Sequence, residues 1–162
     1  MTRLALILSL LSSLVFLAGC ARGGEGSLDA FREKWYASVN QRQPEQLYHL
    51  LDAKGRRFID VQLETLRGLD AEKQKSVINW LGGDRVSNLH ELNSARFFGL
   101  MWRKVTDDQP PKMVIEAQGD QGAYMVLNLR EKSQRIELKI EGGRWVWALP
   151  EQRFTLEVKK GN

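Results

Sequence analysis

The stretch Arg135–Leu149, RIELKIEGGRWVWAL, decides the fold. Apolar and polar residues alternate on both sides of Gly142-Gly143, which is the two-residue period of a β-strand. A two-residue glycine turn suits the primed turns of tight hairpins. In this register an ion pair closes the hairpin, three apolar pairs share one face, and a shift by one residue would scatter them. The four predicted pairs are Glu141 with Arg144, Ile140 with Trp145, Leu138 with Trp147, and Ile136 with Leu149.

The residues on both sides of this hairpin also favour strands. Lys112–Gln118 is a strand candidate, and Gly119–Gly122 is a turn candidate. Ala123–Arg130 then alternates apolar and mixed positions. After Pro150, the spacing of Phe154, Leu156 and Val158 predicts a final edge strand. The C-terminal half is therefore expected to form an antiparallel meander of four to five strands.

The N-terminal half shows the period of helices. Ser27 is a predicted N-cap, and the apolar residues that follow it recur every three to four positions. Pro44 suits the first position of a second helix, which Gly55 would end. Asp70 is a predicted cap of a further helix, which Gly82-Gly83 would stop. The predicted inward residues are Leu28, Phe31, Trp35, Val39, Leu47, Leu50, Leu51, Ile59, Leu63, Leu66, Val77, Ile78 and Leu81. The segment ARFFGLMWRK, from Ala95, is read as a last short helix, with a strand as its alternative.

Helices followed by a meander predict an α+β domain, in which the amphipathic helices cover the apolar face of the sheet. The order of elements, with F-x-x-x-W at Phe31–Trp35 followed by P-x-x-L-x-x-L-L from Pro44, resembles the NTF2-like, or cystatin-like, domains. The resemblance covers residues 28–158 and implies a cone formed by a curved sheet and its helices. The extra helix at Asp70–Leu81 departs from the minimal pattern of these domains.

The N-terminus has the anatomy of a secretory signal. Arg3 precedes the apolar run Leu4–Leu17, which is too short to span a bilayer comfortably. Leu17-Ala18-Gly19-Cys20 resembles the lipobox of bacterial lipoproteins, and Cys20 is the only cysteine. That resemblance implies cleavage between Gly19 and Cys20 and attachment of fatty acyl chains, such as palmitate, to Cys20. The alternative is an ordinary signal cut after Ala21.

Three regions follow from this interpretation. Residues 1–19 are the predicted signal peptide, residues 20–27 the lipidated cysteine with a glycine-rich tether, and residues 28–162 a single domain. Ala21 is not the aspartate that tends to retain lipoproteins in the inner membrane, so the resemblance implies the outer membrane, facing the periplasm. In a Gram-positive host the protein would stand on the outer face of the plasma membrane.

Charge does not suggest a nucleic-acid partner. The formal net charge is +4, and the basic pairs Arg56-Arg57, Arg103-Lys104 and Lys159-Lys160 are separate in the sequence and close to acids. A solvated surface with mild attraction to anionic lipid is the expected reading.

We find no catalytic set. The sequence lacks a G-x-S-x-G elbow, an H-E-x-x-H motif and a Cys/His cluster, so we expect no catalytic residues, no metal and no cofactor beyond the lipid on Cys20. Enzymes of the NTF2-like class place an acid, a histidine or a tyrosine inside the cone. The residues of the last two types here are His49, His90, Tyr36, Tyr48 and Tyr124, and for the histidines an ordinary surface role is favoured.

Tryptophan is the remaining feature, with five in the chain. Trp145 and Trp147 share a strand face, and Trp35 lies on a helix expected to cover it. Their spacing places them on the apolar faces of their elements, which favours core positions, but they would line a pocket if the cone were not fully filled. The sequence thus predicts a non-enzymatic, lipid-anchored envelope protein that binds or helps to assemble other proteins. The alternatives are a small-ligand carrier and an NTF2-like enzyme, both using the cavity between sheet and helices. A filled cone would remove both.

Overall fold

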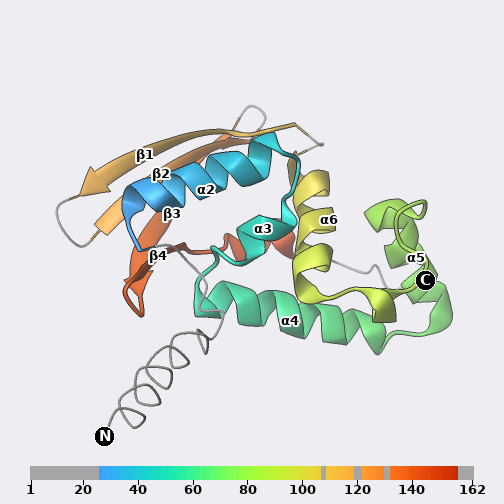
Figure 1. Ribbon diagram of the computed structural model, residues 1–162. Helices are drawn as coiled ribbons and strands as arrows, with labels where there is room; N and C mark the ends of the chain where they lie inside the picture. Colours follow the sequence, from blue (N-terminus) through green and yellow to red (C-terminus); the bar gives the residue numbers. More distant parts are fainter. Residues whose placement is uncertain (1–25, 107–108, 119–121, 130–131, 157–162) are drawn as a thin grey trace, which may run out of the picture.

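The protein is described here from a computed structural model, which covers residues 26–106, 109–118, 122–129 and 132–156. Helices come first and a curled antiparallel sheet of four strands follows (Figure 1). The predicted α+β architecture is therefore confirmed. The helices are α2 (Leu28–Asn40), α3 (Glu45–Tyr48), α4 (Ala53–Arg67), α5 (Ala71–Gly82), the 3-10 turn η1 (Leu89–Glu91), α6 (Ser94–Thr106) and α7 (Glu151–Phe154). The strands are β1 (Lys112–Gln118), β2 (Gly122–Leu129), β3 (Lys132–Glu141) and β4 (Arg144–Trp147).

The central hairpin has the predicted register over its first three pairs. Glu141 pairs with Arg144, Ile140 with Trp145, and Leu138 with Trp147. Gly142 and Gly143 have φ values of 58° and 78°, and a positive φ at both central residues defines the type I′ turn. The predicted glycine turn is therefore confirmed, because only glycine takes this conformation twice without strain.

The hairpin differs from the prediction at both of its ends. Ile140 lies two residues from the turn and keeps 46% of its surface exposed, whereas its partner Trp145 is buried. At the other end β4 stops at Trp147, before Leu149 can face Ile136. Trp147 instead pairs in parallel with Leu51, and its backbone N–H donates to the Leu50 carbonyl at 3.0 Å.

Polar caps start the long helices where the sequence indicated. Ser27 Oγ accepts from the Ala30 N–H at 3.1 Å, and Asp70 Oδ1 accepts from the Lys73 N–H at 2.9 Å. Each cap satisfies a backbone donor that the first helical turn leaves without a partner. The segment after Asn93 is a helix, α6, rather than a strand.

Two predicted elements are wrong. Gly55 does not end a helix begun at Pro44; α3 is only four residues long, and Gly55 lies in the first turn of α4. The chain leaves the helical path here because the Leu50 carbonyl accepts from the Trp147 N–H and the Asp52 N–H donates to the Trp147 carbonyl. The second error is the edge strand after Pro150. Its first residues form α7, while Val158, like the turn residues 119–121, lies outside the described residues.

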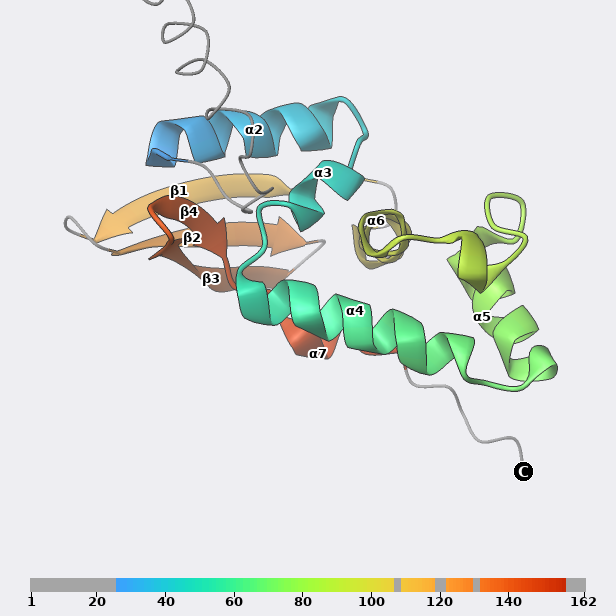
Figure 2. The ribbon, with the colours of Figure 1, turned by 60° about the horizontal axis from the view of Figure 1, so that its bottom comes forward.

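The helices cover one face of the sheet. α2 lies along that face, α6 stands beside α3 at one end, and α5 lies away from the sheet (Figures 1 and 2). Side chains of alternate strand residues, such as Met125, Leu127 and Leu138, are buried beneath the helices. On the opposite face Val114 keeps 54% of its surface exposed. The core therefore lies between the helices and this one face of the sheet.

Candidate functional site

The space between sheet and helices is filled with aromatic rings. Trp35 of α2 and Trp147 of β4 are fully buried, with ring centroids 5.0 Å apart in an edge-to-face arrangement. Trp102 of α6 meets both of these rings edge-on, at 5.6 Å and 5.9 Å. Phe154 of α7 stacks on Phe98 at 5.5 Å and closes the cluster from the far side.

This packing places the three tryptophans that the sequence singled out in the core. Trp145 is 9% exposed, and neither of the two cavities described below is lined by Trp35, Trp145 or Trp147. The Trp147 indole N–H donates to the Leu47 carbonyl at 3.3 Å. The Trp35 indole nitrogen is buried and has no hydrogen-bond partner in the described part of the chain. All three rings are therefore buried in the core, which is the position that their spacing in the sequence favours.

The tyrosines considered from the sequence have structural partners. The Tyr36 hydroxyl donates to the Met113 carbonyl at 2.8 Å, and Tyr124 lies beneath the Arg135 guanidinium at 3.9 Å. The Tyr48 hydroxyl donates to Asp60 Oδ1 at 2.8 Å. Burial, this hydrogen bond and the Asp60 charge raise the pKa of Tyr48 to about 12. Tyr48 therefore stays protonated at neutral pH.

The two histidines are both exposed. His49 follows α3 and meets the Tyr48 ring edge-on at 5.5 Å. Partial burial, with the positive charges of Lys34 and Arg56, lowers the pKa of His49 below its usual value. His90 lies in η1, beside α4. No contact joins the two histidines among the described residues, and neither lines a described cavity.

Asp52 is a buried carboxylate, but it is fully engaged. The side chain is 3% exposed; Oδ1 accepts from the Gly55 N–H at 2.6 Å, and Oδ2 lies 2.7 Å from Lys139 Nζ. The hydrogen bond to Asp52, assisted by Glu141, raises the pKa of Lys139. A Cβ on Gly55 would lie 2.8 Å from Asp52 Oδ1 and 2.9 Å from Leu149 Cβ. Asp52 thus starts α4 and ties it to β3, which is a structural role.

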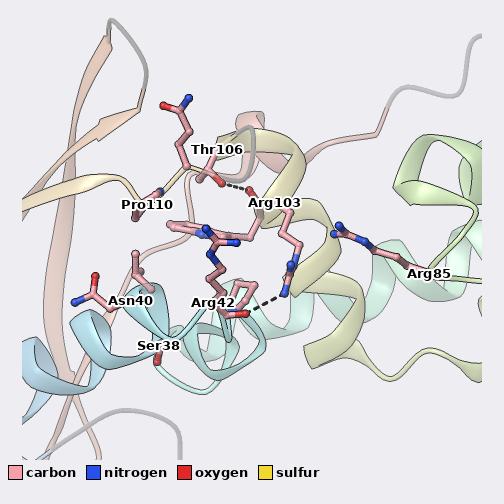
Figure 3. A pocket seen from close by; sticks show the side chains of 11 residues that line it. Ser38, Asn40, Arg42, Arg85, Arg103, Thr106 and Pro110 are labelled. Atoms are coloured by element: carbon pink, nitrogen blue, oxygen red, sulfur yellow. Dashed lines mark hydrogen bonds between the residues drawn. The ribbon is translucent and has the colours of Figure 1, made fainter.

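The described surface carries a cleft lined by three arginines. It encloses about 360 Å³ where the loop after α2, the loop after α5 and the end of α6 meet (Figure 3). Arg42, Arg85 and Arg103 come from these three elements, and no acidic side chain is among the described residues that line the cleft. Asp107 and Asp108 follow Thr106 in the chain and lie outside the described residues.

Of the other polar side chains that line the cleft, Ser38, Asn40, Thr106 and Gln109, the two hydroxyls are engaged with their own helices. The Ser38 hydroxyl donates to the Lys34 carbonyl at 2.7 Å, and the Thr106 hydroxyl donates to the Trp102 carbonyl at 2.9 Å. The hydroxyl protons are therefore not available to a ligand, whereas the guanidinium groups of Arg42 and Arg85 each carry five N–H donors in a planar fork. The arginines thus supply most of the donors that could face a ligand in the cleft.

Sequence reasoning missed this cleft. In the sequence the positive residues are scattered, and Arg103 belongs to an isolated pair. The fold brings Arg42, Arg85 and Arg103 together from distant parts of the chain. No local pattern could have found them, because each lies at the end of a different helix.

A second cavity is an apolar groove along α4. It encloses about 370 Å³ and is lined by Phe58, Val61, Gln62, Thr65, Leu66, Leu69 and Leu156. The α4 residues recur at the three- to four-residue spacing of one helix face. No charged side chain is among the described residues that line it, and its polar members are Gln62 and Thr65.

The described residues hold no cluster of three or more His, Cys, Asp or Glu side chains that could bind a metal ion. None of the helices in the described ranges has the length and hydropathy needed to span a membrane. Gly19 and Cys20, the predicted cleavage and lipidation residues, lie outside the described residues.

No protein-family model, curated protein or solved structure matches this chain. Function must therefore be argued from the sequence and from the site.

Proposed function

We propose that this protein is a lipid-anchored envelope protein that acts as a non-enzymatic interaction or assembly module. Two independent features support the proposal: the predicted lipid anchor and the filled interior of the domain. The lipobox-like sequence Leu17-Ala18-Gly19-Cys20 supports an anchor at Cys20, held by several acyl chains because one chain binds a membrane only weakly. The tether at residues 20–27 would then present one domain to the periplasm from the outer membrane, or to the outside of a Gram-positive cell.

The filled interior is the observation that carries the interaction role. An NTF2-like enzyme or a ligand carrier would use the space between sheet and helices. Here that space holds Trp35, Trp102 and Trp147 in mutual contact. The buried carboxylate Asp52 faces Lys139 and a helix N-terminus instead of a cavity. Binding is therefore expected on the surface, as in a protein-interaction domain.

The experiment is in-cell cross-linking and affinity purification of the tagged protein, with Cys20→Ser as the matched variant. We expect Cys20→Ser to block normal processing, to release the protein from membranes and to reduce capture of a partner. Unchanged membrane retention with normal cleavage would refute the anchor. Absence of any partner above background for the anchored protein would refute the interaction role.

A further inference from the structure

We propose that the arginine cleft, where the loops after α2 and α5 meet the end of α6, binds a short acidic segment of a partner protein. The carboxylates of that segment would lie on Arg42 and Arg85. This inference deepens the proposed interaction role and rests on it. Four properties of the cleft support it: charge, order, walls and position.

The charge of the cleft favours an anion. Arg42 and Arg85 are exposed, and no ion pair holds either guanidinium among the described residues. Figure 3 shows the Arg42 guanidinium within the cleft and that of Arg85 directed toward Arg103. Guanidinium groups bind carboxylates through two parallel N–H···O bonds, which are shorter and stronger than neutral hydrogen bonds.

The backbone of the cleft is ordered before any ligand arrives. Arg103 Nη2 donates to the Arg42 carbonyl at 2.9 Å and so fastens the loop after α2 to α6. Arg42 has a φ of 56°, which is uncommon for a residue with a side chain. The Gln43 N–H donates to the Ser38 carbonyl at 2.8 Å, which closes the turn around Arg42. A fixed loop reduces the entropy lost when a ligand binds.

The walls of the cleft favour a peptide over a bare inorganic anion. Val39, Pro44, Trp102 and Pro110 line the cleft beside the arginines; the first three are buried and Pro110 is exposed. Its volume of about 360 Å³ is at the lower end of the range for small-molecule pockets, roughly 300–1,000 Å³. A short extended segment with an apolar side chain next to acidic ones fits both the charge and the size.

The position of the cleft favours a partner over the lipid surface. The tether joins α2 at Leu28, and the cleft lies at the opposite end of this 13-residue helix. At 1.5 Å per residue the helix separates the two by about 20 Å. The residue at which the tether joins the domain and the cleft are thus at opposite ends of α2, so a partner protein is favoured over a headgroup.

The direct test measures binding of a fluorescein-labelled peptide of alternating glutamate and leucine to the purified full-length protein in detergent. Fluorescence anisotropy reports the affinity, and a lysine–leucine peptide is the charge-reversed control. We expect binding of the glutamate peptide alone, weakened by about 0.5 M NaCl because salt screens exposed charges. The double variant Arg42→Gln, Arg85→Gln should lose about tenfold or more in affinity.

Arg57→Gln is the matched control, because Arg57 is an exposed arginine on α4, away from the cleft. It should leave the affinity unchanged. Glutamine at position 42 retains a side chain at the positive φ, so that substitution does not remove backbone strain. Arg103 is left intact because it holds the loop.

Several results would overturn the inference. These are absence of peptide binding, an equal loss in Arg57→Gln, or binding of inorganic phosphate or phosphatidylglycerol vesicles in preference to the peptide.

In-cell capture separates this inference from the proposed function. A partner that the anchored Arg42→Gln, Arg85→Gln variant retains in full would refute the cleft and leave the interaction role standing. No partner with either protein would refute the interaction role itself.

Discussion

Replacing Trp147 tests whether the aromatic cluster holds the domain together. The side chain is fully buried, its ring lies within 6.3 Å of Trp35, Trp102 and Phe98, and its N–H donates to the Leu47 carbonyl. Truncation of a buried tryptophan to alanine costs about 3–5 kcal/mol. Each edge-to-face pair contributes about 0.5–1.5 kcal/mol and the hydrogen bond about 1 kcal/mol, so we expect the upper end of that range.

The measurement is equilibrium urea unfolding followed by far-UV circular dichroism, with Trp80→Ala as the control. Trp80 keeps 43% of its surface exposed, so its truncation should change the free energy of unfolding by less than about 1 kcal/mol. A loss of about 5 kcal/mol approaches the whole stability of a small domain. Trp147→Phe therefore accompanies the alanine variant, because it retains a ring but loses the hydrogen bond, and it should cost about 1–3 kcal/mol.

Two results would refute this reasoning. A cost below about 1 kcal/mol for Trp147→Ala would mean that the ring is not enclosed. An equal cost for Trp147→Ala and Trp80→Ala would mean that burial does not distinguish the two sites.

Three further changes probe the contacts around α4. Gly55→Ala should lower the free energy of unfolding by about 1–3 kcal/mol in the same urea assay, since its Cβ would meet Asp52 and Leu149. Gly68→Ala, whose Cβ would lie 3.5 Å from the Thr65 carbonyl oxygen, should be close to neutral. Lys139→Met should lower the free energy of unfolding by about 1–2 kcal/mol because Asp52 loses its cation. In a double-mutant cycle, the same Lys139→Met change made in the Asp52→Asn variant should have almost no effect on that free energy. His49→Gln should reduce the loss of stability between about pH 7 and pH 5. The folded-state pKa of His49 is lowered, so the unfolded chain binds more protons and stability falls as the pH drops through the unfolded-state value of 6.5. Identical pH profiles of wild type and variant would contradict the role of His49.

The sequence predicted those elements whose signal is local and repeated. The β3–β4 hairpin is specified twice, by alternation on each strand and by two glycines that take positive φ. Ser27 and Asp70 were predicted as caps because a short polar side chain before an apolar helical stretch has few other uses. At such positions neighbouring residues alone decide the structure.

The errors fall where a distant contact decides between two local readings. Gly55 follows an apolar run, as a helix-ending glycine does. It lies instead in the first turn of α4, where a Cβ would collide with the buried Asp52 and Leu149. Phe154 and Leu156 have the spacing of a strand, but two residues cannot distinguish a strand from a helical turn. The stack of Phe154 on Phe98 and Trp102 favours α7.

The packing of the interior has a consequence for where binding can occur. Three tryptophans in mutual contact occupy the space between the sheet and the helices. A ligand could enter there only by displacing buried rings, which would cost several kcal/mol each. The α4 groove is accessible but apolar and would select little beyond shape. The arginine cleft combines accessible charge with a loop that Arg103 already fastens, so specificity is available there without disturbing the core.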